Sequence, residues 1–249
     1  MIVQHNMTAL NANRQLGITN TNLARSTEKL SSGYRVNRAA DDAAGLSISE
    51  KMRGQIRGLE QASTNAEDGQ SLIQTAEGAL SEIHSVLQRM RELTVQASND
   101  TNVSADRKAI AKEVRALTSE INRIATQTQF NTMGLLSGGF KNKKLQVGAN
   151  TNQTISITIS SMTAGKLGVS AKVIAKVISS STGKDITKLI TTVNTAITKV
   201  STQRSALGAL QNRLDHTIAN ADNMAENLQS SESKIRDVDM ADEMVSYSA

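Results

Sequence analysis

Two long stretches of the chain place apolar residues at seven-residue intervals. The first has two rows three positions apart, and its spacing is that of the a and d positions of a coiled coil. Because apolar residues also extend upstream, the pattern predicts one helix from about residue 42 to about residue 98, roughly 85 Å long. The first row comprises Leu59, Ala66, Ile73, Leu80, Leu87 and Thr94, and the second comprises Ala62, Gly69, Ala76, Ile83, Met90 and Ala97.

Two further helices follow from the same kind of pattern. After a turn-forming segment at residues 98–102, apolar spacing resumes from Ile110 to Thr128. The longest row runs from Ile186 to Ile235. Because the seams match and lie near both ends of the chain, the last helix is expected to fold back on the first two. The predicted fold class is mainly α, an elongated antiparallel helical bundle or coiled-coil rod.

The middle of the chain changes to a period of two. Residues 144–147 and 154–159 alternate apolar and polar side chains around a segment rich in Gly and Asn, which predicts a small β-hairpin at the distal end of the rod. Residues 160–184 are rich in Ser, Thr, Lys and Gly. In this segment the sequence predicts only a short helix or strand around residues 173–178.

Composition supports long helices and limits the chemistry. The chain lacks proline, Trp and Cys and is only 2% aromatic, so no residue forces a helix to break and no disulfide or thiolate metal site exists. The first residues do not form a cleavable signal, and no segment approaches the roughly 20 apolar residues that span a bilayer. We expect a protein that does not insert in membranes, or that leaves the cell without a removable signal.

Positive charge is concentrated in one region. The net charge is +5, but nine Lys and one acid, Asp185, lie between Phe140 and Lys199, which gives 9 − 1 = +8 there and −3 elsewhere. Phe140 is the one aromatic residue of this region, so it offers no stacking platform for bases. A solvated surface is the favoured interpretation, without nucleic acid as a partner.

No catalytic motif is present. His5, His84 and His216 are dispersed, and the sequence contains no HExxH pair, phosphate-binding glycine loop or nucleophile elbow. The acids are scattered singly. We therefore predict a protein that is not an enzyme and holds no metal or cofactor.

One segment carries a specific resemblance. Residues 30–45 read LSSGYRVNRAADDAAG, which resembles the N-terminal signature of bacterial flagellins, and blocks at residues 69–80, 88–96, 128–131 and 219–241 agree with it. Physically, Gly33 permits a chain reversal, while Asp41 or Asp42 can cap the long helix that follows.

The resemblance implies the organisation and the role of the chain. Residues 1–42 would be the N-terminal part of the filament-core domain with its connecting spoke, and residues 43–239 a helical rod domain with the hairpin and a variable segment at about 140–184. Residues 240–249 would begin a C-terminal filament-core segment. The implied function is a structural subunit of the extracellular flagellar filament, secreted by the flagellar export machinery with a chaperone and polymerising with itself. The bulky outer domains of larger flagellins are missing.

The resemblance also implies a binding surface for the ectodomain of Toll-like receptor 5, a vertebrate receptor of innate immunity. With Leu87 and Met90 at a and d, Arg89 lies at c, away from the seam, and Leu93 lies at g, on its shoulder. The same face is expected to make subunit contacts, so receptor binding and assembly should compete. The implied contact residues are Gln88, Arg89, Glu92, Leu93, Gln96 and Glu113.

The ends of the chain raise a further expectation. Flagellins normally continue past the equivalent of residues 240–248 with another amphipathic helix, whereas this chain stops at Ala249. The N-terminal helix, with candidate polymerisation residues Leu16, Leu23 and Leu30, is then expected to lack its partner. Short helices without packing are marginal in water, so we expect residues before about 31 to be mobile and self-assembly to be poor.

Two other functions fit part of the pattern. A hook–filament junction protein shares the terminal-helix plan, and heptads alone would permit a generic coiled-coil binding or adhesion module. The near-complete signature and the receptor-type block favour a flagellin. Sedimentation at rising concentration discriminates the last alternative, because a homopolymer continues to associate whereas a binding module reaches a fixed stoichiometry.

Overall fold

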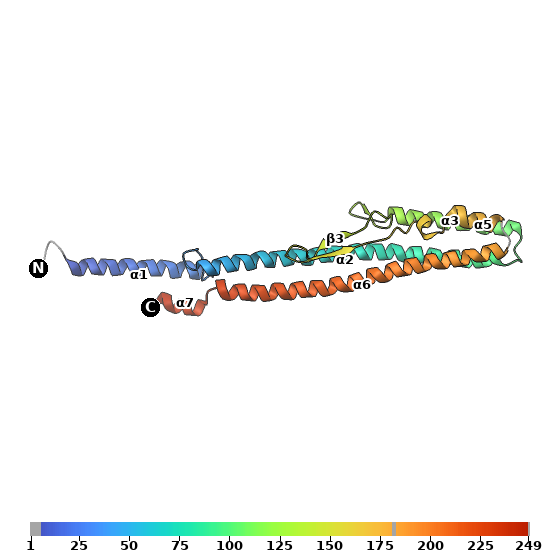
Figure 1. Cartoon of the computed structure of the whole chain (residues 1–249). Helices are drawn as coiled ribbons and strands as arrows, with labels where there is room; N and C mark the ends of the chain where they lie inside the picture. The colour runs from blue at the N-terminus through green and yellow to red at the C-terminus, as the bar shows by residue number, and fades with distance from the viewer. Residues whose placement is uncertain (1–5, 181–182, 249) are drawn as a thin grey trace. The chain divides into compact units, whose positions relative to one another are not determined.

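The computed structural model describes residues 6–180 and 183–248 and is mainly helical (Figure 1). The chain forms two compact units: a terminal unit of residues 1–60 and 221–249, and a central unit of residues 61–220. The helices are α1 (Met7–Ser32), α2 (Ala43–Ser98), α3 (Ser104–Gln127), α4 (Ala164–Leu167), α5 (Ala171–Ser180), α6 (Gly183–Arg236) and α7 (Met240–Ser248). The strands are β1 (Gln129–Phe130), β2 (Met133–Gly134), β3 (Lys143–Gln146) and β4 (Thr154–Ile157).

Helix α2 confirms the first predicted helix almost to the residue. Of the two proposed caps, Asp42 performs the role, because its Oδ1 accepts a hydrogen bond from the Gly45 N–H at 2.8 Å. Asp41 instead closes the preceding loop, accepting from the backbone N–H groups of Arg38 at 2.9 Å and Asn37 at 3.2 Å. The hydrogen bond from Arg38 is the main cause that lowers the pKa of the Asp41 carboxyl below its ordinary value.

The core of the central unit is the seam between α2 and α6. Every residue of both α2 rows from Ala66 to Ala97 is buried, and so is the α6 row from Ile186 to Leu214. Gln70 Nε2 donates to Asp215 Oδ1 at 3.0 Å, and Arg204 Nη2 lies 3.6 Å from Glu77 Oε1. A later residue of α2 thus pairs with an earlier residue of α6, so the two helices are antiparallel. Burial of each Leu or Ile contributes about 1.5–3 kcal/mol, so this seam contributes a substantial part of the stability of the central unit.

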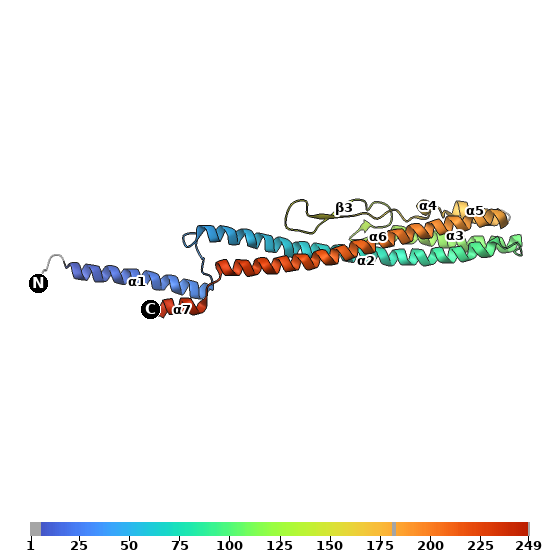
Figure 2. The same ribbon diagram turned by 60° about the horizontal axis from the view of Figure 1, so that its bottom comes forward.

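Helices α3 and α5 add a second layer to the central unit (Figure 2). The segment around residues 173–178, predicted as a short helix or strand, is helical and forms part of α5. Its buried face, which includes Ile174 and Ile178, packs against α3. Thr118 of α3 is buried, and its hydroxyl donates to the carbonyl of Val114 at 2.8 Å, which satisfies the polar group inside the core.

Strands β3 and β4 confirm the predicted hairpin, with Leu145 opposite Ile155 in an antiparallel pair. The hairpin does not lie at the distal turn after α2, as the sequence suggested. It packs beside the earlier part of α2, where Asn65 Nδ2 donates to the Gln146 carbonyl at 3.1 Å. A Cβ on Gly69 would lie 2.3 Å from Leu145 Cδ1, so a larger residue there would displace the end of the Leu145 side chain. The chain returns along α3 before it forms the hairpin, which explains the difference.

A second heptad row of α6 lies three positions after the row that begins at Ile186, and Gln203 interrupts it for a structural reason. Its Oε1 accepts from the Ser160 N–H at 3.4 Å, and its Nε2 donates to the Thr158 carbonyl at 3.3 Å. The amide thus pairs with the backbone that follows β4. A polar residue in the seam fixes the returning chain to α6.

Strands β1 and β2 form a second hairpin that the sequence analysis missed. Its two-residue turn has φ values of +46° at Asn131 and +64° at Thr132. Turns with two positive φ values match the strand twist but favour Asn-Gly, and a β-branched residue is strained there. Threonine in place of glycine removed the usual signal for such a turn.

In the terminal unit, two segments distant in sequence form a short backbone ladder. Helix α1 ends at Gly33, whose φ of +74° and N–H bond to the Lys29 carbonyl confirm the predicted chain reversal. The Arg35 N–H then donates to the Arg236 carbonyl at 2.7 Å, and the Val238 N–H donates to the Gly33 carbonyl at 3.0 Å. These bonds connect the end of α1 to the end of α6.

The sequence predicted that α1 lacks a partner, and the expectation of poor self-assembly rested on that prediction. The prediction is wrong, because α7 lies against α1. Lys29, in its last turn, is 3.6 Å from Glu243 of α7. Even so, no residue of α1 is buried. The contact with α7 therefore covers only part of the helix surface.

The strained turn between β1 and β2 gives a test of local stability. We expect Thr132→Gly to raise the free energy of unfolding by about 0.5–1 kcal/mol in urea denaturation, because glycine adopts positive φ without steric strain. The control, Thr191→Gly on the exposed side of α6, should lower the stability by a few tenths of a kcal/mol. A destabilised Thr132→Gly protein would contradict the assigned turn.

Candidate functional site

A cluster of charged side chains bridges α2 and α3 in the central unit. Arg89 Nη1 donates to Glu92 Oε2 at 2.9 Å on the same helix. Its Nε and Nη2 both donate to Glu113 Oε1 on α3, at 3.1 and 3.0 Å. All three side chains are exposed. One guanidinium therefore fixes two carboxylates on the surface.

The heptad pattern explains why Arg89 points outward. Leu87 and Met90 occupy the a and d positions of the seam and are fully buried, so Arg89, at the c position, faces away from the core. The hydrogen bonds to Glu92 and then to Glu113 raise the pKa of the Arg89 guanidinium. The guanidinium of Arg89 is thus held between two carboxyl groups in a defined geometry.

The other α2 residues of the implied surface divide into two groups. Gln88 and Gln96 are exposed, as expected, and Gln88 Nε2 lies 3.0 Å from His84 Nε2. Leu93 was expected on the shoulder of the seam, but it is only 2% exposed and belongs to the core. Because α2 packs against α3 as well as α6, its apolar stripe widens to include the g position. Leu93 is therefore not available to a partner in this structure.

Val95 is an exposed apolar residue of this surface that the sequence analysis did not identify. It is 49% exposed and lies between Glu92 and Gln96 along α2. Its b position in the heptad was the available signal, since an apolar residue there has no place in the seam. Unlike Leu93, Val95 is therefore accessible on the surface.

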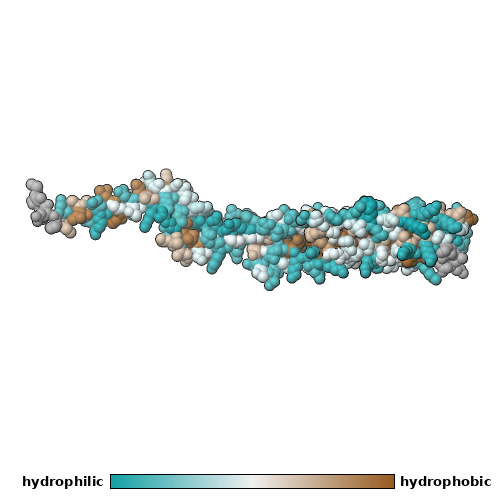
Figure 3. All heavy atoms as spheres, turned by 90° about the horizontal axis from the view of Figure 1, so that it is seen from above, coloured by the Kyte–Doolittle hydropathy of each residue, from teal (hydrophilic) through white to brown (hydrophobic). Residues whose placement is uncertain are grey.

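Helix α1 of the terminal unit presents a different kind of surface. Leu16 is 62% exposed, Leu23 is 42% exposed, and Leu30 is half-buried. Ile18 is 49% exposed and, at 100° per residue, lies on the other side of the helix from Leu16. Figure 3 shows hydrophobic side chains scattered along α1, the helix next to the grey N-terminal atoms. Apolar groups are thus exposed on two sides of one helix.

Neither a metal site nor a membrane span is found in the parts that the structure describes. Across residues 6–180 and 183–248, no three acidic or histidine side chains converge on a point where an ion would fit. None of the helices in those ranges has an apolar stretch sufficient to cross a bilayer.

Comparisons with known proteins decide the family. Residues 3–141 match the bacterial flagellin N-terminal helical region, and residues 190–249 match the C-terminal helical region. The chain belongs to the bacterial flagellin family. It is 52% identical to the flagellin of Halalkalibacterium halodurans, over 99% of this chain and 89% of that protein. It is 47% identical to the flagellin of Bacillus subtilis, over 99% of this chain and 90% of that protein.

Solved structures agree with this assignment. The Bacillus cereus flagellin superposes with a TM-score of 0.55 at 30% identity, over 66% of this chain and 94% of that one. Bacillus cereus FlgL gives a TM-score of 0.60 over 74% of this chain and 99% of that one, but at 15% identity, so that likeness concerns the fold alone. The mainly α fold and the resemblance to flagellins are both confirmed.

Membership defines the general role of the protein. This flagellin is a structural subunit of the flagellar filament, not an enzyme, and its place is the extracellular filament. The 52% identity to a flagellin over nearly the whole chain also favours this assignment over the hook–filament junction protein and the generic coiled-coil module.

Proposed function

We propose that this flagellin is exported by the flagellar export machinery with a chaperone and polymerises through its terminal helices. The exposure of Leu16, Leu23 and Ile18 on two sides of α1 supports this most directly. A helix with apolar groups on several sides is stable only when neighbours surround it. Since no residue of α1 is buried, copies of the same chain would supply those neighbours.

The domain organisation belongs to the same proposal. Residues 1–42 would form the N-terminal filament-core part and spoke, and residues 240–249 the beginning of the C-terminal filament-core segment. Residues 43–239 would form the rod domain, with the hairpin and variable segment at 140–184. Exposed Met244 and Val245 on α7 support a role in assembly like that of α1.

We also propose that the central unit is a ligand of Toll-like receptor 5 through the α2–α3 surface. Gln88, Arg89, Glu92, Gln96 and Glu113 would contact the receptor, and Leu93 would act from the core by holding α2 in position. The support is the Arg89 cluster, whose charges are already ordered. Ordered side chains lose less conformational entropy on binding than free ones, so a prearranged cluster favours recognition.

Polymerisation through α1 is tested with Leu16→Glu/Leu23→Glu. We expect this variant to remain monomeric under conditions in which the unaltered chain forms filaments, because charged groups cannot enter an apolar subunit contact without a large desolvation cost. Negative-stain electron microscopy and sedimentation provide the readout. The helix content by circular dichroism should stay within a few per cent, since both positions are exposed.

The control variant is Gln15→Glu/Asn22→Glu. It places the same two charges at the same spacing on the same helix, one position earlier. We expect it to polymerise. If both double variants polymerise as well as the unaltered chain, the terminal helix is not the assembly surface.

Receptor recognition is tested by the affinity of monomers for the purified receptor ectodomain. We expect Arg89→Ala and Glu113→Ala each to weaken binding about tenfold or more, as for central charged residues of interfaces. The affinity loss of the double variant should be smaller than the product of the two single-variant losses, because both substitutions break the same Arg89–Glu113 ion pair.

The matched control is Arg91→Ala, two residues along α2 and also exposed. It should change the affinity less than twofold. If Arg89→Ala and Glu113→Ala both bind with unchanged affinity, the proposed receptor surface is wrong. If Arg91→Ala loses as much affinity as Arg89→Ala, the loss comes from the lower net positive charge and not from the cluster. Binding should also fall when the chain is polymerised, since assembly and recognition would share this face.

A further inference from the structure

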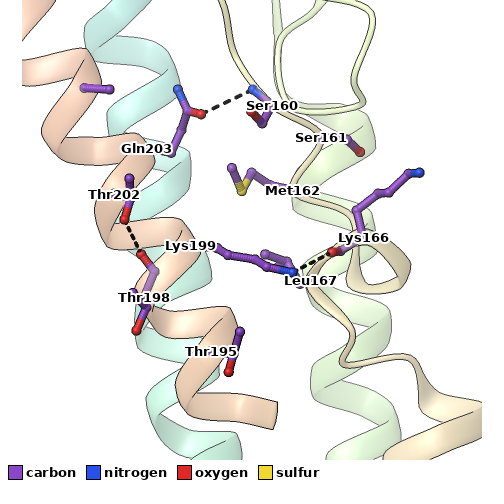
Figure 4. A pocket seen from close by; sticks show the side chains of 11 residues that line it. Ser160, Ser161, Met162, Lys166, Leu167, Thr195, Thr198, Lys199, Thr202 and Gln203 are labelled. Carbon is purple, nitrogen blue, oxygen red and sulfur yellow. Dashed lines mark hydrogen bonds between the residues drawn. The ribbon is translucent and has the colours of Figure 1, made fainter. Parts of the chain in front are cut away.

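A groove lies in the central unit between residues 160–167 and α6 (Figure 4). Its volume is about 460 Å³, and the buried side chains of Met162 and Leu167 form an apolar floor. A second groove of about 520 Å³ adjoins it and shares Leu167, Thr195 and Lys199 with the first. The combined site has room for more than one small ring-shaped group.

Two cations of the first groove, Lys166 and Lys199, are not neutralised by acidic side chains of the described residues. Lys199 Nζ donates to the backbone carbonyl of Lys166 at 3.3 Å, which leaves two of its three N–H groups for other acceptors. Neither Lys166 nor Lys199 forms an ion pair with another residue in the described ranges. Among the residues that the structure describes, no acidic side chain lines either groove. Both lysines are exposed. Lys199 extends from α6 across the groove, whereas Lys166 points away from α6 in Figure 4, so its flexible side chain would turn toward a ligand on binding.

Three threonines of the first groove, Thr195, Thr198 and Thr202, offer acceptors to a ligand. Their hydroxyl protons are already donated to backbone carbonyls of α6: Thr195 to Thr191 at 2.9 Å, Thr198 to Asn194 at 3.0 Å and Thr202 to Thr198 at 2.9 Å. A hydroxyl has one proton but two lone pairs, so each oxygen keeps accepting capacity. The wall of α6 therefore offers neutral acceptors beside the two cationic donors.

We propose that this groove binds an acidic polysaccharide. The lysines suit anionic acceptors, and the threonine oxygens accept from O–H or N–H donors; a glycan of uronic or sulfated sugars carries anionic groups and several O–H donors on its rings. Its C–H faces suit the floor of Met162 and Leu167. A residue of an acidic peptide offers one backbone N–H donor and no such ring face. Among the described residues that line the grooves, none is aromatic, so none stacks on nucleic acid bases.

The test is isothermal titration of the full chain with oligogalacturonate, whose residues carry both carboxylates and hydroxyls. We expect binding at low ionic strength that weakens as salt is added. Polyacrylate of the same charge, which has carboxylates without hydroxyls, should bind about tenfold more weakly. A neutral maltooligosaccharide should not bind measurably.

Variants separate the groove from general charge. Lys166→Gln/Lys199→Gln should lose at least about tenfold in affinity for oligogalacturonate. The control Lys141→Gln/Lys143→Gln removes the same charge from exposed positions outside the groove and should lose less than about threefold. Thr195→Val/Thr198→Val should weaken the binding of oligogalacturonate about three- to tenfold and leave the affinity for polyacrylate unchanged. All altered residues are exposed, and circular dichroism verifies that each variant is folded.

Several results would overturn the proposal. They are the absence of binding, an equal loss in both lysine variants, or equal affinity for polyacrylate and oligogalacturonate. Tighter binding of an oligothymidylate of equal charge, with the same dependence on Lys166 and Lys199, would assign the groove to nucleic acid instead.

Discussion

The antiparallel packing of α2 against α6 in the central unit is the interaction on which the other features depend. With both a and d rows buried from Ala66 to Ala97, α2 is fixed in rotation about its own axis. That rotation directs Arg89 outward and Gly69 toward the β3–β4 hairpin. The same packing makes one wall of the polysaccharide groove from the exposed threonines of α6. Burial on one side of each helix thus determines which side chains are available on the other.

Burial decreases where the same helices continue into the terminal unit. The α6 row is fully buried at Leu214 but only half-buried at Leu228 and Ile235. On α2, Ile48 is 46% exposed although it extends the same apolar face. No residue of α1 is buried. A sequence patterned for contact that is not made within one chain is suited to contact between chains, which agrees with the role of a filament subunit.

The sequence predicted the features that depend on repetition along one element. The bounds of α2, a cap at Asp41 or Asp42, the reversal at Gly33 and the β3–β4 hairpin all follow from local spacing or from the chemistry of one residue. What it did not predict depends on a third element. Leu93 is buried because α3 covers a side of α2 that a two-helix seam would leave open.

Long-range polar contacts were also inaccessible from spacing alone. The resemblance implied both Arg89 and Glu113 as contact residues, but the sequence does not predict their ion pair, because nothing in either helix fixes the register between α2 and α3. The amide of Gln203 looked like a defect in a heptad row, whereas its partners lie 43 and 45 residues away. The β1–β2 turn was missed because Thr132 replaces the glycine that normally identifies it.

The most direct test of this account is residue-resolved hydrogen exchange of α2 in the monomer. Amides of residues 61–98 should exchange many times more slowly than those of residues 43–60 in the same continuous helix, because opening the buried seam costs much more free energy than fraying a half-exposed turn. On polymerisation, residues 43–60 and α1 should become protected. Uniform protection along α2 in the monomer, with equally slow exchange in α1, would contradict the claim that burial in the central unit, and not in the terminal unit, stabilises the monomer.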